Sequence, residues 1–326
     1  MTRILTAGCV VAGLGAAIAY AQAPDSVEAH RAAAKLAAGK DFVGVMDRAC
    51  PAPAPATPAA TTQAKGAPAA QPRIPPQEEW YTGPVKVFDN LYFVGTKVHG
   101  AWAVTTSAGI IVIDALYDYA VESEVDGGLR KLGLDPANIK YLVVSHGHGD
   151  HHGGAKYIQD HFGPHLIMGP LDWDLVERDT RNPRPRRDMV ATDGQKLTLG
   201  DTTLTLYITP GHTPSTISTL VPVKDGGRPH LAAEWGGTAI TTATPIEQLR
   251  AYVASAARFR DVASGAGADV IIANHTAFDL TLDKLAALAK RKPGDPNPWI
   301  IGKDAVNRYL TVAEECGKAT LGSVKP

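Results

Sequence analysis

The chain has 326 residues, of which 44% are hydrophobic, so it can bury a sizeable core in one or two domains. Its 32 basic and 33 acidic side chains give a formal net charge of −1 at pH 7. Because there is no overall positive charge, nucleic acid is not an expected partner.

Residues 1–23 have the pattern of a secretory signal peptide. Arg3 gives a basic start, an apolar run follows through Ile18, and small residues then repeat as far as Ala23. The run is short for a membrane span, and no later stretch is expected to cross a membrane. We therefore expect a periplasmic or secreted protein, with no stable membrane span once the signal is removed.

Two cysteines, Cys50 and Cys316, would remain in the exported chain. An oxidising compartment would allow a disulfide between them, which would tie the start of the chain to its last predicted helix. Two buried free thiols are an equal alternative, because spacing along the sequence does not give the geometry.

The sequence divides into three parts after the signal. Residues 24–50 are predicted to form a helical arm, because the alanine-rich stretch from Ser26 to Arg48 begins with a good N-cap. Residues 51–78 are rich in proline and alanine and are predicted to be a linker without a core. Residues 79–326 are predicted to be the catalytic domain.

The first half of this domain is predicted to contain two hairpins, two helices and a further strand. Asp89 and Asn90 mark the first hairpin turn. The predicted strands are 85–88, 91–94, 101–105, 109–115 and 139–144, and the predicted helices are 118–132 and 154–162.

The second half repeats this order of strands and helices. Its predicted strands are 165–168, 196–199, 203–208, 217–223, 230–233 and 270–273, and its predicted helices are 171–178, 245–263, 280–291 and 305–316. Two β-rich halves, each followed by helices, predict an α/β fold, a four-layer αββα sandwich. Between them, the proline-broken loop 179–188 carries four arginines and is either a solvated loop or a wall that attracts an anionic substrate.

The stretch from Ser145 to Gly154 contains four histidines and one aspartate, directly after a predicted buried strand. Imidazole and carboxylate are zinc ligands, and α/β sheets place their sites at such strand ends. His146 and His148 lie two residues apart, so on an extended loop they point the same way. Asp150 and His151 follow at once. One tetrahedral zinc cannot easily use all four, so we expect two metals, each completed from elsewhere.

Two further histidines follow predicted strands in the same way. His212 follows strand 203–208, and His275 follows strand 270–273. Three histidine-bearing loops at strand ends therefore predict one shared metal site. His152 and Asn274 are expected to support the ligands, whereas Asp114 either supports a ligand or holds a loop.

From Trp80 to Lys292 the chain resembles the metallo-β-lactamase-fold hydrolases, on the sequence His-Gly-His-Gly-Asp-His at residues 146–151 and on the order of the later motifs. The resemblance implies two Zn²⁺ ions per chain, each held by three side chains. These are His146, His148 and His212 for the first zinc, and Asp150, His151 and His275 for the second.

This ligand set is that of the third metallo-β-lactamase subclass, which the chain resembles most. Other members carry an additional Asp or Cys ligand between the last two histidines, but residues 231–238 contain neither. Glu234 is an alternative bridging ligand. Thr238 and Thr241 lie where the third subclass has a serine-bearing segment, and with His99 they are the candidate substrate contacts.

The resemblance implies a zinc-dependent hydrolase that opens the amide of β-lactams with a metal-bound hydroxide, a route to antibiotic resistance. Asp150 is the predicted catalytic side chain, because it can orient that nucleophile. We expect a small-molecule substrate with a carbonyl and an anionic group. The alternatives are a lactone or other ester hydrolase on the same metals, and a metal-binding member of the fold without turnover.

Overall fold

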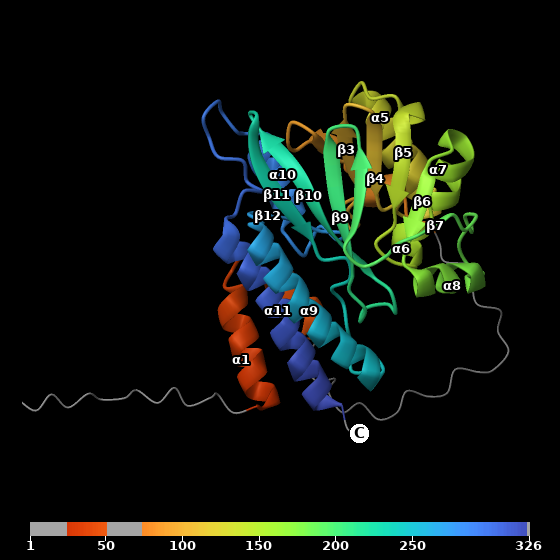
Figure 1. Cartoon of the computed structure of the whole chain (residues 1–326). Coiled ribbons are helices and arrows are strands. Elements are labelled where there is room, and N and C mark those ends of the chain that lie inside the picture. Colours follow the sequence, from red (N-terminus) through yellow and green to blue (C-terminus); the bar gives the residue numbers. More distant parts are fainter. Residues whose placement is uncertain (1–24, 51–73, 325–326) are drawn as a thin grey trace, which may run out of the picture.

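The computed structural model describes residues 25–50 and 74–324 (Figure 1). The predicted signal peptide, residues 1–23, and most of the predicted linker, residues 51–78, lie outside these ranges. Among the helices within them, none combines the length and the apolar character that a membrane crossing needs.

The first sheet has seven strands, which lie side by side in their sequence order. Neighbours from β1 to β4 are antiparallel, and neighbours from β4 to β7 are parallel. Helices make the parallel crossovers, as such connections require. The strands are β1 (Val85–Lys86), β2 (Leu91–Phe93), β3 (Trp102–Thr106), β4 (Gly109–Ile113), β5 (Ile139–Val143), β6 (His165–Met168) and β7 (Met189–Val190).

The second sheet has five strands in the order β12-β11-β10-β9-β8. All neighbours are antiparallel except β11 and β12, which are parallel and are joined through α9. The strands are β8 (Gln195–Leu199), β9 (Thr202–Ile208), β10 (Ile217–Asp225), β11 (Arg228–Glu234) and β12 (Val270–Ile272).

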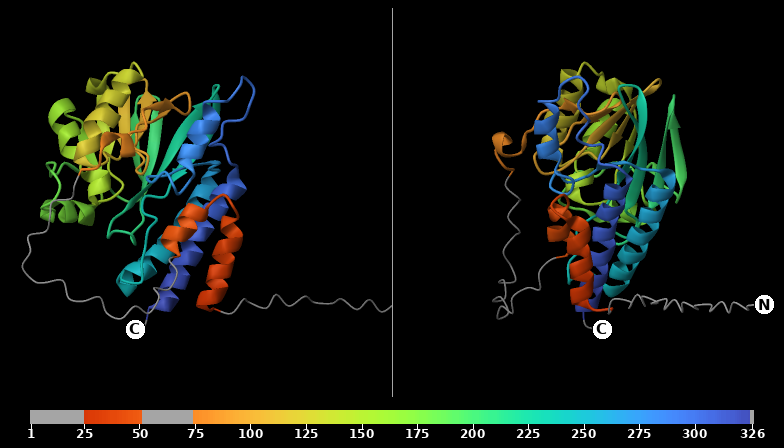
Figure 2. Two further views of the ribbon diagram at one scale, coloured as in Figure 1. Left: turned by 180° about the vertical axis from the view of Figure 1, so that it is seen from behind. Right: turned by 90° about the vertical axis from the view of Figure 1, so that its left-hand side faces the viewer.

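Three hydrophobic cores separate four layers, which confirms the predicted αββα sandwich (Figure 2). The central core lies between the two sheets and contains Trp102 and Trp299. One outer core covers the first sheet with α4 (Asp118–Val121), the π-helical η1 (Glu122–Asp126), α5 (Gly127–Lys131), α7 (Ala155–Phe162) and α8 (Pro170–Arg178). The other covers the second sheet with α1 (Val27–Ala38), α2 (Val43–Ala49), α9 (Ile246–Ala266) and α11 (Lys303–Ser323).

The remaining elements are short: α3 (Gln77–Trp80), η2 (Pro136–Asn138), α6 (Gly149–His152) and α10 (Thr281–Leu288). The single helix expected over residues 118–132 is α4, η1 and α5 in succession, and the terminal helix is longer than the predicted 305–316.

Residues 25–50 form two helices rather than the one expected from their composition. The chain turns at Gly39, whose φ of 54° is easily adopted only without a side chain. Phe42 then packs edge-on against Tyr309 of α11, and Val45 and Ala49 are buried beside it. Cys50 and Cys316 form a disulfide, with 4.7 Å between their Cα atoms. These helices therefore share the outer core of the second sheet.

Several strand ends of both sheets meet at one edge of the sandwich. In the second sheet, Ile208 at the end of β9 pairs with Ile217, and Glu234 at the end of β11 pairs with Ile272 at the end of β12. The N–H of Ile217 donates to the carbonyl of Ser145, which follows β5 of the first sheet, at 2.8 Å. The loops after β5, β9 and β12 are thereby brought together.

Candidate metal centre

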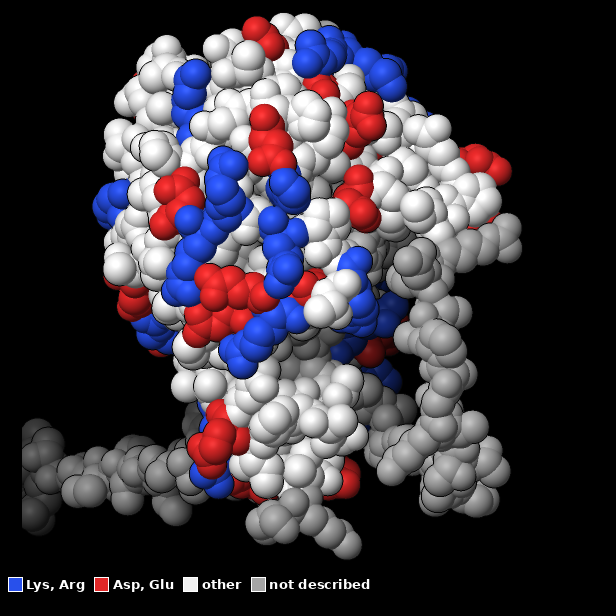
Figure 3. All heavy atoms as spheres, turned by 90° about the vertical axis from the view of Figure 1, so that its right-hand side faces the viewer, with Lys and Arg blue, Asp and Glu red and all other residues white. Residues whose placement is uncertain are grey.

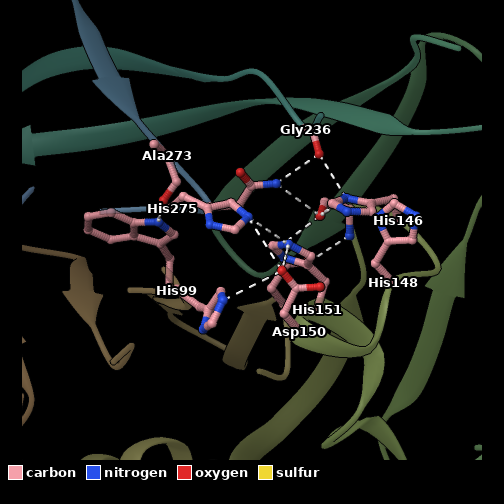
Figure 4. A network of polar contacts seen from close by, with 12 residues as sticks. His99, His146, His148, Asp150, His151, Gly236, Ala273 and His275 are labelled. Atoms are coloured by element: carbon pink, nitrogen blue, oxygen red, sulfur yellow. Dashed lines mark hydrogen bonds and ion pairs between the residues drawn. The ribbon is translucent and has the colours of Figure 1, made fainter. Parts of the chain in front are cut away.

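The first cluster joins three histidines from the loops after β5 and β9, of which His146 and His148 are labelled in Figure 4. Nε2 of His212 lies 3.1 Å from Nε2 of His146 and 3.1 Å from Nδ1 of His148. His146 is buried, whereas His148 is exposed. The cluster is therefore anchored at His146 and open to solvent at His148.

The hydrogen bonds of this cluster leave nitrogen lone pairs facing one another. Nδ1 of His146 lies 2.9 Å from the carbonyl of Gly236, and Nδ1 of His212 lies 2.5 Å from the carbonyl of Ala239. A carbonyl only accepts, so each Nδ1 carries the proton and each neutral ring presents a bare Nε2. Two bare nitrogens 3.1 Å apart repel each other unless a cation lies between them.

Burial keeps these rings neutral. It lowers the pKa of His146 well below its usual value and that of His212 to about 4, and the neighbouring imidazoles add to the effect. Burial likewise lowers the pKa of His275 to about 2. Neutral imidazole is the form that binds metals.

The second cluster centres on one oxygen of Asp150. Its Oδ2 lies 3.3 Å from Nε2 of His151 and 3.5 Å from Nε2 of His275, and these two nitrogens are 3.3 Å apart. Nε2 of His99 faces the same oxygen at 3.6 Å. The three residues predicted for a second metal are thus together, and His99 lies beside them.

Asp114 holds the loop that carries most of these groups. Its Oδ1 accepts the N–H of Ser145 at 2.7 Å, and its Oδ2 lies 2.7 Å from Nδ1 of His151. Burial lowers the pKa of His151, but the charges of Asp150 and Asp114 raise it overall, to about 10. A divalent cation at Nε2 would displace that proton, and Asp114 would keep the proton on Nδ1.

Local sequence explains how so many side chains converge. The motif is not extended throughout: α6 begins after His148, so Asp150 and His151 lie on a helical turn. The N–H of Gly147 donates to Asp172 of α8 at 2.7 Å. A Cβ on Gly236 would lie 1.8 Å from the carbonyl oxygen of Ile217, so only glycine fits at this position, where the carbonyl of Gly236 accepts from Nδ1 of His146.

The segment after β11 contributes few groups to the clusters. Glu234 is fully buried, and neither carboxylate oxygen has a hydrogen-bond partner among the described residues. Burial raises its pKa well above the usual value, and nearby Asp114 raises it further, so a neutral acid is expected. Thr238 is only 2% exposed and Thr241 caps a turn by accepting the N–H of Ala243. The Thr238 hydroxyl is therefore not accessible to a substrate.

Two expected supporting residues make contacts around the clusters. Nδ2 of Asn274 donates to the carbonyl of Gly236 at 2.8 Å, the same carbonyl that binds His146. Nε2 of His152 lies 3.1 Å from Asp179, and Asp179 also accepts from Asn182 at 2.7 Å. His152 therefore anchors the start of the basic loop 179–188.

A pocket of about 270 Å³ adjoins the first cluster at His148. Arg178 and Arg181 line it, together with Gly147, Gly149, Leu175, Asp179 and Thr180. The other three arginines of the loop are engaged elsewhere: Arg184 donates to the carbonyl of Glu177, Arg186 faces Asp160, and Arg187 faces Asp174 and Glu177. Figure 3 shows basic and acidic side chains interspersed on this face, without a broad area of one sign.

The donor sets fit two zinc ions. Ligand atoms at zinc–nitrogen distances of 2.0–2.1 Å in a tetrahedron are about 3.3 Å apart, and the contacts described above span 3.1–3.6 Å. The lone pairs that face one another at His146 and His212 support this fit independently. The structure brings the six predicted ligands together. It also places His99 beside the second cluster, whereas the sequence predicts His99 only as a possible substrate contact.

Residues 95–225 match the model of the metallo-beta-lactamase superfamily. The chain contains a metallo-beta-lactamase superfamily domain. Among solved structures similar to it, BJP-1, a subclass B3 metallo-beta-lactamase of Bradyrhizobium japonicum, is 28% identical with a TM-score of 0.63, over 73% of this chain and 94% of that one. FEZ-1 from Legionella gormanii, at 23% identity and a TM-score of 0.64 over 72% and 94%, has the same fold. The predicted resemblance to the metallo-β-lactamase fold is confirmed.

Curated proteins similar to the metallo-β-lactamase domain include two N-acyl homoserine lactonases named AttM. The one from Azorhizobium caulinodans is 32% identical over 111 residues, and the one from Agrobacterium fabrum is 34% identical over 105. The matches cover 30% and 28% of this chain, and 42% and 40% of the two relatives. The chain thus spans less than half the length of these curated relatives.

Proposed function

We propose that this protein is a dinuclear zinc hydrolase that opens the amide bond of β-lactams. The observation that carries the proposal is the pair of donor clusters beside a pocket lined by two arginines. Similarity to subclass B3 β-lactamases over most of the domain supports it. Zinc ions bound here would lower the pKa of a water molecule and polarise a carbonyl oxygen.

The side chains of the chain itself supply the remaining chemistry. Asp150 would orient the attacking water, because its carboxylate lies among the histidines of the second cluster. Asp114 would hold His151 in one tautomer. Arg178 and Arg181 would bind the carboxylate of a β-lactam beside His148.

The second candidate is hydrolysis of an acyl-homoserine lactone, which the similarity to the AttM lactonases favours. Such a lactone carries no negative charge, so it gains nothing from the two arginines. Dependence of turnover on Arg178 and Arg181 therefore distinguishes a β-lactam substrate from an acyl-homoserine lactone.

The first test compares turnover of a penicillin, a cephalosporin and a carbapenem with turnover of an acyl-homoserine lactone, with and without a chelator. We expect lactam opening that a chelator abolishes and zinc restores. Turnover of the lactone alone would replace the proposal with the second candidate. Zinc binding without turnover of either substrate would indicate a non-catalytic member of the fold.

The pocket is tested with Arg181→Ala. A single exposed charge contact is worth up to about 1 kcal/mol, so KM for a carboxylate-bearing lactam should rise about two- to fivefold, with kcat little changed. Arg186→Ala is the matched control, because Arg186 belongs to the same loop but does not line the pocket. Equal effects of the two substitutions would contradict the assignment.

The predicted export is part of the proposal. An oxidising compartment is where the Cys50–Cys316 disulfide would persist. Osmotic-shock fractionation of cells that express the full chain should release the protein with periplasmic markers, and retention with cytosolic markers would argue against export.

A further inference from the structure

We propose that His99 is a fourth ligand of the second metal, so that this metal is held by four side chains and the first metal by three. The inference rests on the proposed metal binding, but not on any particular substrate. It assigns to the loop between β2 and β3 a role in the metal centre.

The spacing of donor atoms is the first support. Nε2 of His99 lies 3.6 Å from Oδ2 of Asp150, close to the 3.5 Å between that oxygen and His275. One donor atom each from these three residues falls within 4.8 Å of the others. These separations are slightly larger than the edge of a zinc tetrahedron, about 3.3 Å. They are longer than a strong hydrogen bond between imidazole and carboxylate.

The backbone of His99 is fixed to the segment that carries His275. The two residues form an antiparallel bridge, and Gly100 N–H donates to the carbonyl of Asn274 at 2.8 Å. Thr276 N–H donates to the carbonyl of Val98 at 3.0 Å. A substrate-contact residue on a free loop would need no such attachment, whereas two ligands of one ion must keep a constant separation.

The ring of His99 is also held in place. It packs edge-on against Tyr117, with 5.2 Å between ring centroids, and against His275 at 5.1 Å. Its side chain is only 15% exposed. Figure 4 shows the ring directed toward Asp150. The orientation is therefore built before any ion binds.

Four protein ligands at the second site and three at the first would make the two sites differ in affinity and in access for water. A zinc with four protein ligands resembles a closed structural site, and a zinc with three keeps a position open for water or substrate. We therefore expect the second site to fill first and bind more tightly. The open position would belong to the first site, next to the pocket of Arg178 and Arg181.

The experiment is titration of the metal-free full chain with Co²⁺, followed by visible absorption, together with zinc competition against a chromophoric chelator. Wild type should bind two ions in two steps. His99→Ala and His99→Gln should weaken the tighter step at least about tenfold, as loss of groups that merely support ligands already can, and should change the cobalt spectrum of that step. The weaker step should be unaffected.

Three comparison variants show which of the two metal-binding steps a substitution weakens. His275→Ala should weaken the same step as His99→Ala, and His148→Ala should weaken the other one. His161→Ala removes an exposed histidine outside both clusters and should change neither. Far-UV circular dichroism checks that each variant is folded.

Wild-type affinities and an unchanged cobalt spectrum in both His99 variants would overturn the inference, and a raised KM in the same variants would then assign His99 to the substrate. A wild type that binds fewer than two ions would overturn both this inference and the dinuclear proposal. A wild type that binds two ions but opens no lactam would overturn only the substrate proposal, and the tenfold loss in the His99 variants would still support the fourth ligand.

Discussion

Asp114 shows how much of the centre depends on a single side chain. It directly follows β4 and has a φ of 61°, which a non-glycine residue seldom adopts, and asparagine and aspartate tolerate it best. From this position its two oxygens reach the backbone and hydroxyl of Ser145 and the ring of His151. The strained backbone thus places the Asp114 carboxylate beside the end of β5, where it contacts Ser145 and His151.

Asp114→Asn keeps the shape and the backbone preference but replaces one acceptor with a donor. The new amide N–H₂ would face either the Ser145 N–H or the protonated Nδ1 of His151, so one contact is lost. We expect the second metal site to lose about 10–100-fold in affinity, measured by zinc competition. Asp188→Asn is the control, because it alters an aspartate paired with the exposed His165. Equal affinities in both variants would contradict this role.

Glu124 gives a pH prediction that does not involve the metals. Burial raises its pKa from 4.5 to about 7, although Thr82 N–H donates to its Oε1. Between pH 4.5 and pH 7 the Glu124 carboxyl loses its proton in the unfolded chain but keeps it in the folded chain. The contribution of Glu124 to the unfolding free energy therefore falls as pH rises from about 4.5 to about 7.

Urea unfolding across this pH range checks the prediction. The difference in unfolding free energy between wild type and Glu124→Gln should fall through the window and level off above pH 7. A flat difference for Glu124→Gln would refute the raised pKa.

Among the elements, those with strong local patterns were predictable. The strands before the ligand loops are apolar or alternating runs of three to seven residues, and His146, His212 and His275 lie three or four residues past their ends. The ligand clusters could be inferred because strand ends meet at one edge of an α/β sheet.

Features that depend on distant contacts could not be predicted. Nothing local to His99 shows that its loop pairs with residues 274–276. The helical turn that begins at Gly149 depends on distant backbone contacts, such as the N–H of Ala115 donating to the carbonyl of His151, whereas the expectation for His146 and His148 is an extended loop. The bend after Ala38 depends on a glycine whose φ is visible only in three dimensions.

The packing of α2 gives a prediction for one element. A Cβ on Gly44 would lie 1.9 Å from the carbonyl oxygen of Ala277, two residues beyond His275. Gly44→Ala should therefore push α2 away from this segment, lower the Tm and weaken the second metal site. Scanning calorimetry and zinc competition measure the two effects.

Gly265→Ala is the matched control within α9, where an added Cβ meets nothing within 4 Å. Alanine favours a helix over glycine by about 1 kcal/mol, so this variant should have an equal or higher Tm. A Tm for Gly44→Ala as high as that of the control would show that α2 is not tightly packed against the segment.

In the whole molecule, the candidate metal centre joins the two sheets. His146, His148, Asp150 and His151 follow β5 of the first sheet, whereas His212 and His275 follow strands of the second. Ions that bind only the folded chain stabilise it by mass action. Both halves of the sandwich should therefore gain stability when zinc is added.

The disulfide lies in the outer core that covers the second sheet. It closes a loop between residues separated by 266 positions. Removing a disulfide commonly costs roughly 2–5 kcal/mol of unfolding free energy. We expect a loss of this size in Cys50→Ser/Cys316→Ser by urea unfolding, and reductant should lower the stability of wild type but not of the variant. Equal stabilities would contradict a formed disulfide.

The same bond closes residues 50–316, most of the chain, into a ring. A single backbone cut anywhere between Cys50 and Cys316 opens the ring without separating the fragments. Protein nicked in the predicted linker, residues 51–78, should migrate as one band on a non-reducing gel and as two after reduction. The helices α1 and α2 would then remain attached to the rest of the chain by the disulfide rather than by a peptide bond, so cutting the linker would leave them in place.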